Sequence, residues 1–100
     1  MEIADNPAMD RYEMRVDGAP AGNLLYQLRP GVLALNHTGV FDRFEGEGLG
    51  SRLIAFALDD ARQRGLAVLP FCPFVKDYIQ RHPQYADLVP AEERARFGLA

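Results

Sequence analysis

The glycine-rich stretch Glu45–Ser51 is the part of the chain whose residue types and spacing most clearly suggest chemistry. Its alternate glycines, Gly46, Gly48 and Gly50, let the backbone turn tightly and leave no side chains over the turn. The stretch follows an apolar segment and opens a helical pattern. The free N–H groups and the positive end of that helix's dipole would lie at the turn. We therefore expect an anion site here, most often one for phosphate.

The other reactive side chains are not spaced as any metal or nucleophile motif. His37 and His82 lie far apart in the sequence and Cys72 has no partner at ligand spacing, so no metal site is predicted. No segment matches a Ser-His-Asp motif. A P-loop would place Lys and then Ser or Thr at the helix start, where this chain has Gly50-Ser51-Arg52. We set the nucleotide-binding P-loop aside.

Three predicted strands precede the turn. Residues 11–17 alternate between apolar and charged, which indicates a strand with one solvated face. Residues 23–29 and 32–40 form the next two, separated by turn residues at 18–22 and at Pro30-Gly31. Such short connections predict an antiparallel meander. Residues 1–10 show little periodicity and are expected to be a flexible leader.

After the turn the apolar pattern changes to a helical period, with Leu49, Leu53, Phe56, Ala57 and Ala61 on one face. This helix, residues 49–64, is expected to end at Gly65, before a buried strand at 66–71. Strand, helix and strand then give a parallel pair. A second helix begins at Pro73 and ends near His82-Pro83. Residues 90–100 form a short amphipathic tail, and the paired acids 59–60 and 92–93 are expected on solvated helix faces.

Composition is that of one small globular domain. The chain has 100 residues, 48% of them hydrophobic and 25% charged. Its net charge of −3 without a basic run argues against nucleic acid as a partner. No apolar run reaches membrane-spanning length and no export signal is visible, so no membrane partner is expected. A single cysteine suits the reducing cytoplasm. The oligomeric state is left open.

Four segments carry a family resemblance: residues 37–40 (HTGV), 44–53 (FEGEGLGSRL), 69–74 (LPFCPF) and 78–85 (YIQRHPQY). With the strands from residue 11 onward they resemble the GNAT superfamily of acetyl-CoA-dependent N-acetyltransferases, in particular its short single-domain branch. The resemblance implies an α/β fold, with the meander continued by one parallel strand through a β-α-β crossover and two main helices packed on the sheet. It covers residues 11–89.

The resemblance also implies a ligand, acetyl-CoA, and a reaction, transfer of acetyl to an amine. The pantetheine arm would pair with Asn36–Val40, where strands 32–40 and 66–71 splay apart, and a backbone N–H near Thr38, Gly39 or Val40 would polarise the thioester carbonyl. Glu45 stands where the superfamily has Gln or Arg. The expected phosphate donors are therefore the backbone N–H groups of the turn, namely those of Gly46, Glu47, Gly48, Leu49, Gly50 and Ser51.

Three side chains are candidates for catalysis. Cys72 could protonate the coenzyme thiolate or take the acetyl group itself, or it could be a buried apolar residue. Tyr78 could protonate the leaving sulfur or pack on the core. His37, on the strand face of Leu33 and Leu35, could be a base or a hydrogen-bonded core residue. Arg81 could contact an outer phosphate of the coenzyme or build a rigid helix end.

Two functions remain open on the sequence alone. Full-length members of the superfamily have a helical region after the first strand that helps to bind the acceptor, and this chain has no room for one. An open acceptor side fits a protein amine better than a small metabolite. The alternative is a non-catalytic module that binds acetyl-CoA or CoA as a sensor or as a subunit held by a partner.

Overall fold

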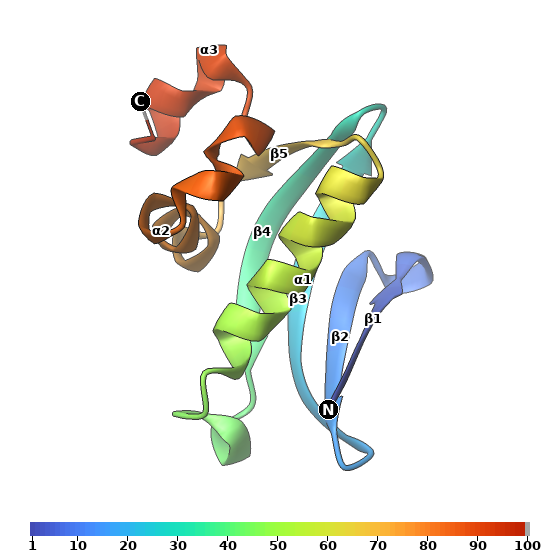
Figure 1. Ribbon diagram of the computed structural model, residues 1–100. Helices are drawn as coiled ribbons and strands as arrows, with labels where there is room; N and C mark the ends of the chain where they lie inside the picture. The colour runs from blue at the N-terminus through green and yellow to red at the C-terminus, as the bar shows by residue number, and fades with distance from the viewer. Residues whose placement is uncertain (100) are drawn as a thin grey trace.

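The computed structural model describes residues 1–99 and contains one five-stranded sheet with strand order β1-β2-β3-β4-β5 (Figure 1). The strands are β1 (Glu2–Asn6), β2 (Arg11–Val16), β3 (Ala19–Arg29), β4 (Val32–Val40) and β5 (Ala67–Pro70). The first four pair antiparallel, whereas β4 and β5 run parallel. The predicted α/β fold, a meander continued by one parallel strand, is confirmed.

The β2–β3 hairpin is tighter than the sequence analysis expected. Asp17 and Gly18 have φ values of 51° and 80°, and they form a two-residue turn between the paired residues Val16 and Ala19. Positive φ at both positions is what the right-handed twist of a hairpin favours, and Asp-Gly supplies it at low cost. β3 therefore begins at Ala19, and Pro20 is accommodated beside a register shift between Met14 and Arg15.

The expectation of a flexible leader over residues 1–10 was wrong. Residues Glu2–Asn6 form the edge strand β1, which pairs with β2 from Glu2↔Arg15 to Asn6↔Arg11. A single 3-10 turn, Pro7–Met9, connects the two strands. β1 has only five residues, too few to give a periodic pattern of apolar side chains. The strand is held by its pairing with β2 rather than by an apolar run of its own.

The helix α1 (Leu49–Gln63) crosses one face of the sheet (Figure 1). Its buried residues recur at helical spacing: Leu49, Leu53, Ile54, Ala57, Leu58 and Ala61. They pack against the inward side chains of the strands, such as Leu24, Leu33 and Leu35, each with no exposed area. Gly65, with φ of 67°, ends the helix as predicted.

The helix α2 (Pro73–Arg81) follows β5 and lies beside β4 and β5, at one edge of the sheet (Figure 1). Proline occupies its first turn, as expected. Beyond it the chain forms a 3-10 segment (Pro83–Leu88), the short helix α3 (Ala91–Arg94) and a last 3-10 turn (Ala95–Phe97). None of the helices within residues 1–99 has the length and apolar character needed to cross a membrane.

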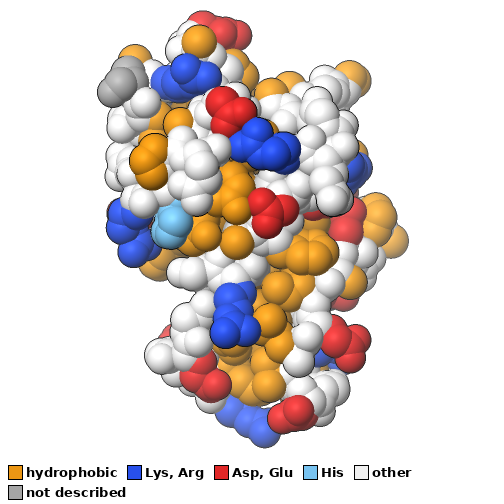
Figure 2. Space-filling model, in the orientation of Figure 1, with side chains coloured by type: hydrophobic (Ala, Val, Ile, Leu, Met, Phe, Trp, Pro, Cys, Tyr) orange, Lys and Arg blue, Asp and Glu red, His pale blue; other side chains and the backbone are white. Residues whose placement is uncertain are grey.

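Charged side chains of both signs alternate over the face drawn in Figure 2, and the described residues form no continuous basic surface there.

Two buried tyrosines tie α1 and β1 to the sheet. The hydroxyl of Tyr12 donates to Asp60 Oδ2 at 2.7 Å, and that of Tyr26 donates to Asp5 Oδ1 at 2.6 Å. The guanidinium of Arg64 lies 3.1 Å from Asp60 and 3.6 Å from Asp5. Asp60 was expected on a solvated helix face. Instead its carboxylate joins the helix to β2 because it accepts the one hydrogen bond that a buried Tyr12 hydroxyl can donate.

These contacts predict a loss of stability at alkaline pH. Burial and then the Asp60 hydrogen bond raise the pKa of Tyr12, burial and then Asp5 raise the pKa of Tyr26, and the Asp59 hydrogen bond raises the pKa of Tyr85 to about 12. The folded state therefore keeps these protons after the unfolded chain has lost them near pH 10. Stability is intact below pH 10 and falls above it, by about 1.4 kcal/mol per pH unit for each of the buried Tyr12 and Tyr26 and by less for the more exposed Tyr85.

Urea unfolding between pH 9 and pH 11.5 measures this slope. The substitution Tyr12→Phe removes one of the three groups and should make the slope shallower. A free energy of unfolding that does not change over this range would contradict the assignment.

Candidate functional site

Strands β4 and β5 separate half-way along β4. Their parallel pairing runs from Val32↔Ala67 to Leu35↔Pro70, and the N–H of Cys72 then donates to the carbonyl of Leu35 at 2.9 Å. Beyond this point β4 continues to Val40 with β3 as its one strand partner among residues 1–99. β5 is paired with β4 over its whole length and ends at Pro70, so the predicted splaying of two longer strands stays a prediction. The end of β5 leaves the α2-facing edge of residues 36–40 free to pair with an extended ligand.

A β-bulge at Asn36 decides which side chains of β4 face inward. The register of β4 against β3 shifts from Tyr26↔Leu35 to Leu25↔His37, so Asn36 has no partner on β3. The extra residue reverses the alternation of the strand. Thr38 is consequently buried, whereas His37 is exposed. The expectation that His37 shares the face of Leu33 and Leu35 was wrong, because a strict period of two cannot anticipate a bulge.

The glycine turn is built as the sequence predicted. Gly46 and Gly48 have φ values of 82° and 71°, in the left-handed region that L side chains rarely adopt. Gly48 is the N-cap of α1 and supplies no side-chain cap. The first backbone N–H to donate within the helix is that of Arg52, whose nitrogen lies 3.4 Å from the carbonyl oxygen of Gly48. The N–H groups of residues 49–51 are therefore available to an anion.

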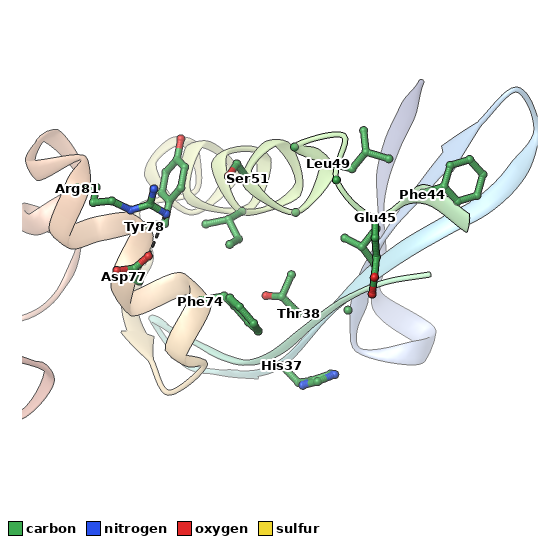
Figure 3. A pocket seen from close by; sticks show the side chains of 16 residues that line it. His37, Thr38, Phe44, Glu45, Leu49, Ser51, Phe74, Asp77, Tyr78 and Arg81 are labelled. Atoms are coloured by element: carbon green, nitrogen blue, oxygen red, sulfur yellow. Dashed lines mark ion pairs between the residues drawn. The ribbon is translucent and has the colours of Figure 1, made fainter. Parts of the chain in front are cut away.

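The glycine turn, the free edge of β4 and α2 enclose one cleft of about 440 Å³ (Figure 3). Most of the predicted ligand-binding residues line this cleft: Thr38, Gly39, Val40, Gly46, Gly48, Leu49, Gly50 and Ser51. Glu47, also predicted, does not line it. His37 lies at its rim, and Figure 3 shows the imidazole directed away from α1. The volume is in the range of small-molecule sites.

The cleft has little positive charge of its own. Arg81 is the one Lys or Arg among the described residues that line it, and its guanidinium pairs with Asp77 at 3.0 Å. Glu45 also lines the cleft, with its carboxylate directed away from the first turn of α1 (Figure 3). An anion in this cleft would therefore be held mainly by backbone N–H groups and the helix dipole rather than by cationic side chains.

Cys72 is buried behind the wall of the cleft. Its side chain is 1% exposed and does not line the cleft. Its Sγ lies 3.4 Å from Oγ1 of Thr38, which does line it. Cys72 is the N-cap residue of α2 but makes no side-chain cap bond, so Thr38 is the hydrogen-bond partner of its sulfur in residues 1–99.

Tyr78 lines the far part of the cleft and is held by neighbouring rings. Its ring stacks on His82, with centroids 3.9 Å apart, and lies 6.0 Å from the ring of Tyr85. His82 in turn makes a 2.8 Å contact from Nδ1 to the carbonyl of Tyr78, in which Nδ1–H is the donor. Figure 3 shows the Tyr78 hydroxyl directed away from Thr38.

Five lining residues were not among the predicted site residues: Phe44, Glu45, Ile54, Phe74 and Asp77. Arg81, named as a possible phosphate contact, also lines the cleft. A signal for part of this set existed in the sequence. Phe74, Tyr78 and Arg81 are spaced i, i+4 and i+7, which places them on one face of α2. Phe74 is 65% exposed, the largest exposed fraction among the large hydrophobic side chains described.

The combination of parts restricts the ligand. The start of α1 suits an anionic group, and the free edge of β4 suits an extended chain with amide groups. Ile54 and Phe74 add apolar side chains to the lining of the same cleft. One elongated molecule with a phosphate end and an amide-containing arm would use all three.

Known proteins share this sequence pattern and this architecture. The model of the GCN5-related N-acetyl-transferase family matches residues 11–88. A GCN5-like protein from Staphylococcus aureus, solved by NMR, is 22% identical with a TM-score of 0.67, over 88% of this chain and 86% of that one. This likeness shows the fold. No curated protein matches the chain significantly.

A crystal structure of ribosomal-protein-alanine N-acetyltransferase from Brucella melitensis biovar Abortus 2308 is 26% identical, with a TM-score of 0.53. The similarity covers 74% of this chain but 58% of the Brucella protein, so the chain spans little more than half of that enzyme's length.

Proposed function

Because the chain belongs to the GCN5-related N-acetyltransferase family, we propose that its cleft binds acetyl-CoA and that the protein transfers the acetyl group to an amine. One observation carries the proposal: the free N–H groups at the start of α1 and the unpaired edge of β4 open into the same cleft. A phosphate site alone would suit many ligands. A phosphate site continued by a strand edge suits a ligand with the shape of this coenzyme.

In this proposal each part of the coenzyme has a separate set of contacts. The pyrophosphate lies at the N–H groups of residues 46–51, where the helix dipole favours negative charge. The pantetheine amides pair with Asn36–Val40 as an added strand would. A backbone N–H near Thr38–Val40 then donates to the thioester carbonyl and stabilises the oxyanion that forms on attack.

The reaction requires a neutral amine and a protonated leaving group. The amine nitrogen attacks the carbonyl carbon, the carbon–sulfur bond breaks with its electron pair on sulfur, and the amine gives up a proton. We assign His37, exposed at the rim, as the candidate base, and Cys72 and Tyr78 as candidate groups on the thiol side. The burial of Cys72 supports a role through hydrogen bonding over acceptance of the acetyl group.

The acceptor is proposed as an accessible primary amine. The first two strands are joined by one 3-10 turn, Pro7–Met9, where longer superfamily members would have helices that bind the acceptor. The name of the Brucella relative makes a peptide with N-terminal alanine the first acceptor to test, with a lysine-containing peptide beside it.

Calorimetric titration with acetyl-CoA, followed by mass spectrometry of the peptides and of the intact protein, tests the proposal. We expect 1:1 binding and an acetylated peptide. Binding without transfer to any amine would favour the non-catalytic module, and an acetyl adduct that disappears in Cys72→Ala would favour a covalent route. The absence of binding would refute the proposed function.

The substitution Phe74→Ala should weaken acetyl-CoA binding by about 10- to 100-fold, since an aromatic side chain that a ligand buries contributes roughly 1.5–3 kcal/mol. The ring is 65% exposed in the free protein, so the free energy of unfolding should change by less than about 0.5 kcal/mol. Phe56→Ala is the control, because Phe56 is 37% exposed on α1 and lies outside the cleft lining. Equal affinities for the two variants would exclude the contact.

A further inference from the structure

Thr38 is an unusual residue in this core. Apart from tyrosine and cysteine side chains, it is the one buried polar residue among residues 1–99, at 7% exposure. The hydrogen-bond partner of its hydroxyl is the thiol of Cys72, with Oγ1 and Sγ 3.4 Å apart. A thiol is a weak partner, so the pair does little to offset the cost of burying a hydroxyl, and valine would fill the same space without that cost.

The bulge at Asn36 is what brings this hydroxyl to the cleft. Without the extra residue, the strand would turn His37 inward and Thr38 outward. With it, Thr38 lines the cleft at the middle of the free β4 segment, and Cys72 lies directly behind it, closed off from the cleft. Thr38 therefore lies between the cleft and the Cys72 thiol.

Two other hydroxyl side chains, Ser51 and Tyr78, line the cleft, and neither is placed like Thr38. Ser51 lies in the first turn of α1, away from Thr38 on β4 (Figure 3). The ring of Tyr78 is fixed by its stack on His82 and by Tyr85, and its hydroxyl is directed away from Thr38 (Figure 3). Thr38 is therefore the hydroxyl that a group lying along β4 would meet.

Resting on the proposed function, we propose that Thr38 is a further catalytic residue, whose hydroxyl donates a hydrogen bond to the coenzyme sulfur. As the amine–carbon bond forms and the carbon–sulfur bond breaks, the electron pair of that bond moves to sulfur. The Thr38 O–H stabilises the resulting thiolate without giving up its proton. The proton lost by the amine passes to the candidate base, His37, and the thiolate is later protonated from solvent.

Cys72 has a positioning role in this arrangement. Its S–H donates to Thr38 Oγ1, which leaves the Thr38 proton free to point into the cleft. The thiol thus acts through Thr38 and forms no bond to the acetyl group. Cys72→Ser keeps a donor at this position and should keep the wild-type thiol pKa of bound CoA, whereas Cys72→Ala removes the donor.

The test measures the thiol pKa of bound CoA, which needs no acceptor. Thiolate absorbance is followed during a pH titration of the CoA complex, and the titration of the ligand-free protein is subtracted. A hydrogen bond to a charged group predicts a pKa about one unit higher on Thr38→Val than on the wild type. Thr38→Ser should restore the wild-type value. Cys72→Ala should raise the pKa in the wild-type background but not in Thr38→Val, because its effect passes through the hydroxyl.

The outcomes separate the two proposals. If CoA does not bind to the wild type, the proposed function fails and this inference falls with it. If CoA binds to the wild type and to Thr38→Val with equal thiol pKa values, the proposed function stands and the role of Thr38 is refuted. An acetyl group found on Cys72 after incubation with acetyl-CoA, or effects of Thr38→Val and Cys72→Ala that simply add, would also refute it. Should Thr38→Val fold poorly, Thr38→Ala gives the same comparison.

Discussion

Gly48→Ala is expected to abolish most acetyl-CoA binding, with a loss of at least about tenfold, because a methyl group enters the space where the pyrophosphate would contact the start of α1. Gly48 lines the cleft, and no protein atom lies within 4 Å of a Cβ placed there, so the added carbon would lie in open space at the start of α1. The backbone at Gly48 has a φ of 71°, and an L residue in this conformation costs roughly 1–2 kcal/mol of stability.

Gly65→Ala is a matched control for the conformational cost. Gly65 has a φ of 67°, its added Cβ also meets no atom within 4 Å, and it lies at the opposite end of the same helix. Both variants should lose similar stability in thermal unfolding, and only Gly48→Ala should lose affinity in calorimetry well below both unfolding midpoints. An equal loss of affinity in both variants would mean that instability, not obstruction of the site, is responsible.

The second large effect is predicted at Gly22, which pairs with Val40 where β3 packs tightly against β4. A Cβ at this position would lie 2.7 Å from the carbonyl oxygen of Gly39 and 3.4 Å from the Cα of Val40. Both are backbone atoms of the β4 segment that lines the cleft, so they cannot move as a side chain would. Gly22→Ala should destabilise the protein by about 1–3 kcal/mol, as overpacking does in well-packed interiors.

Gly39→Ala provides the comparison on the opposite strand. A Cβ there meets only the Nε2 of His37, at 3.5 Å, which is an ordinary contact with a mobile side chain. Its unfolding midpoint should stay close to that of the wild type, whereas Gly22→Ala should lower the midpoint by about 4–8 °C per kcal/mol for a domain of this size. Equal midpoints for the two variants would show that the strands separate more easily than this packing allows.

Residue patterns predicted most of the fold because each element is amphipathic by itself. The apolar period of α1 and the alternation of β2 required no knowledge of their neighbours. Phe56 is an exception within α1: it was expected on the inner face but is 37% exposed, with its ring edge against Tyr12 at 5.9 Å. β1 could not be found in the same way, since its five residues are ordered by pairing with β2. The Asp17-Gly18 turn did carry a signal that would have placed the start of β3 correctly.

The site was predictable where it depends on the backbone and less so where it depends on packing. Alternate glycines before a helix indicate an anion site whatever surrounds them, and the turn lines the cleft as expected. The inward position of Thr38 depends on one inserted residue at Asn36, and no local pattern distinguishes a bulge from a regular strand. The burial of Cys72 likewise depends on Thr38 in front of it.

The central claim is that the start of α1 and the free edge of β4 together hold acetyl-CoA. The most direct test is a titration of the ¹⁵N-labelled protein with acetyl-CoA, followed through its backbone amide resonances. We predict that the largest shifts fall on the amides of Thr38–Val40 and Gly46–Ser51, with smaller changes at Phe74 and none along β1. Unchanged spectra at saturating coenzyme, or shifts centred on another surface, would contradict this claim.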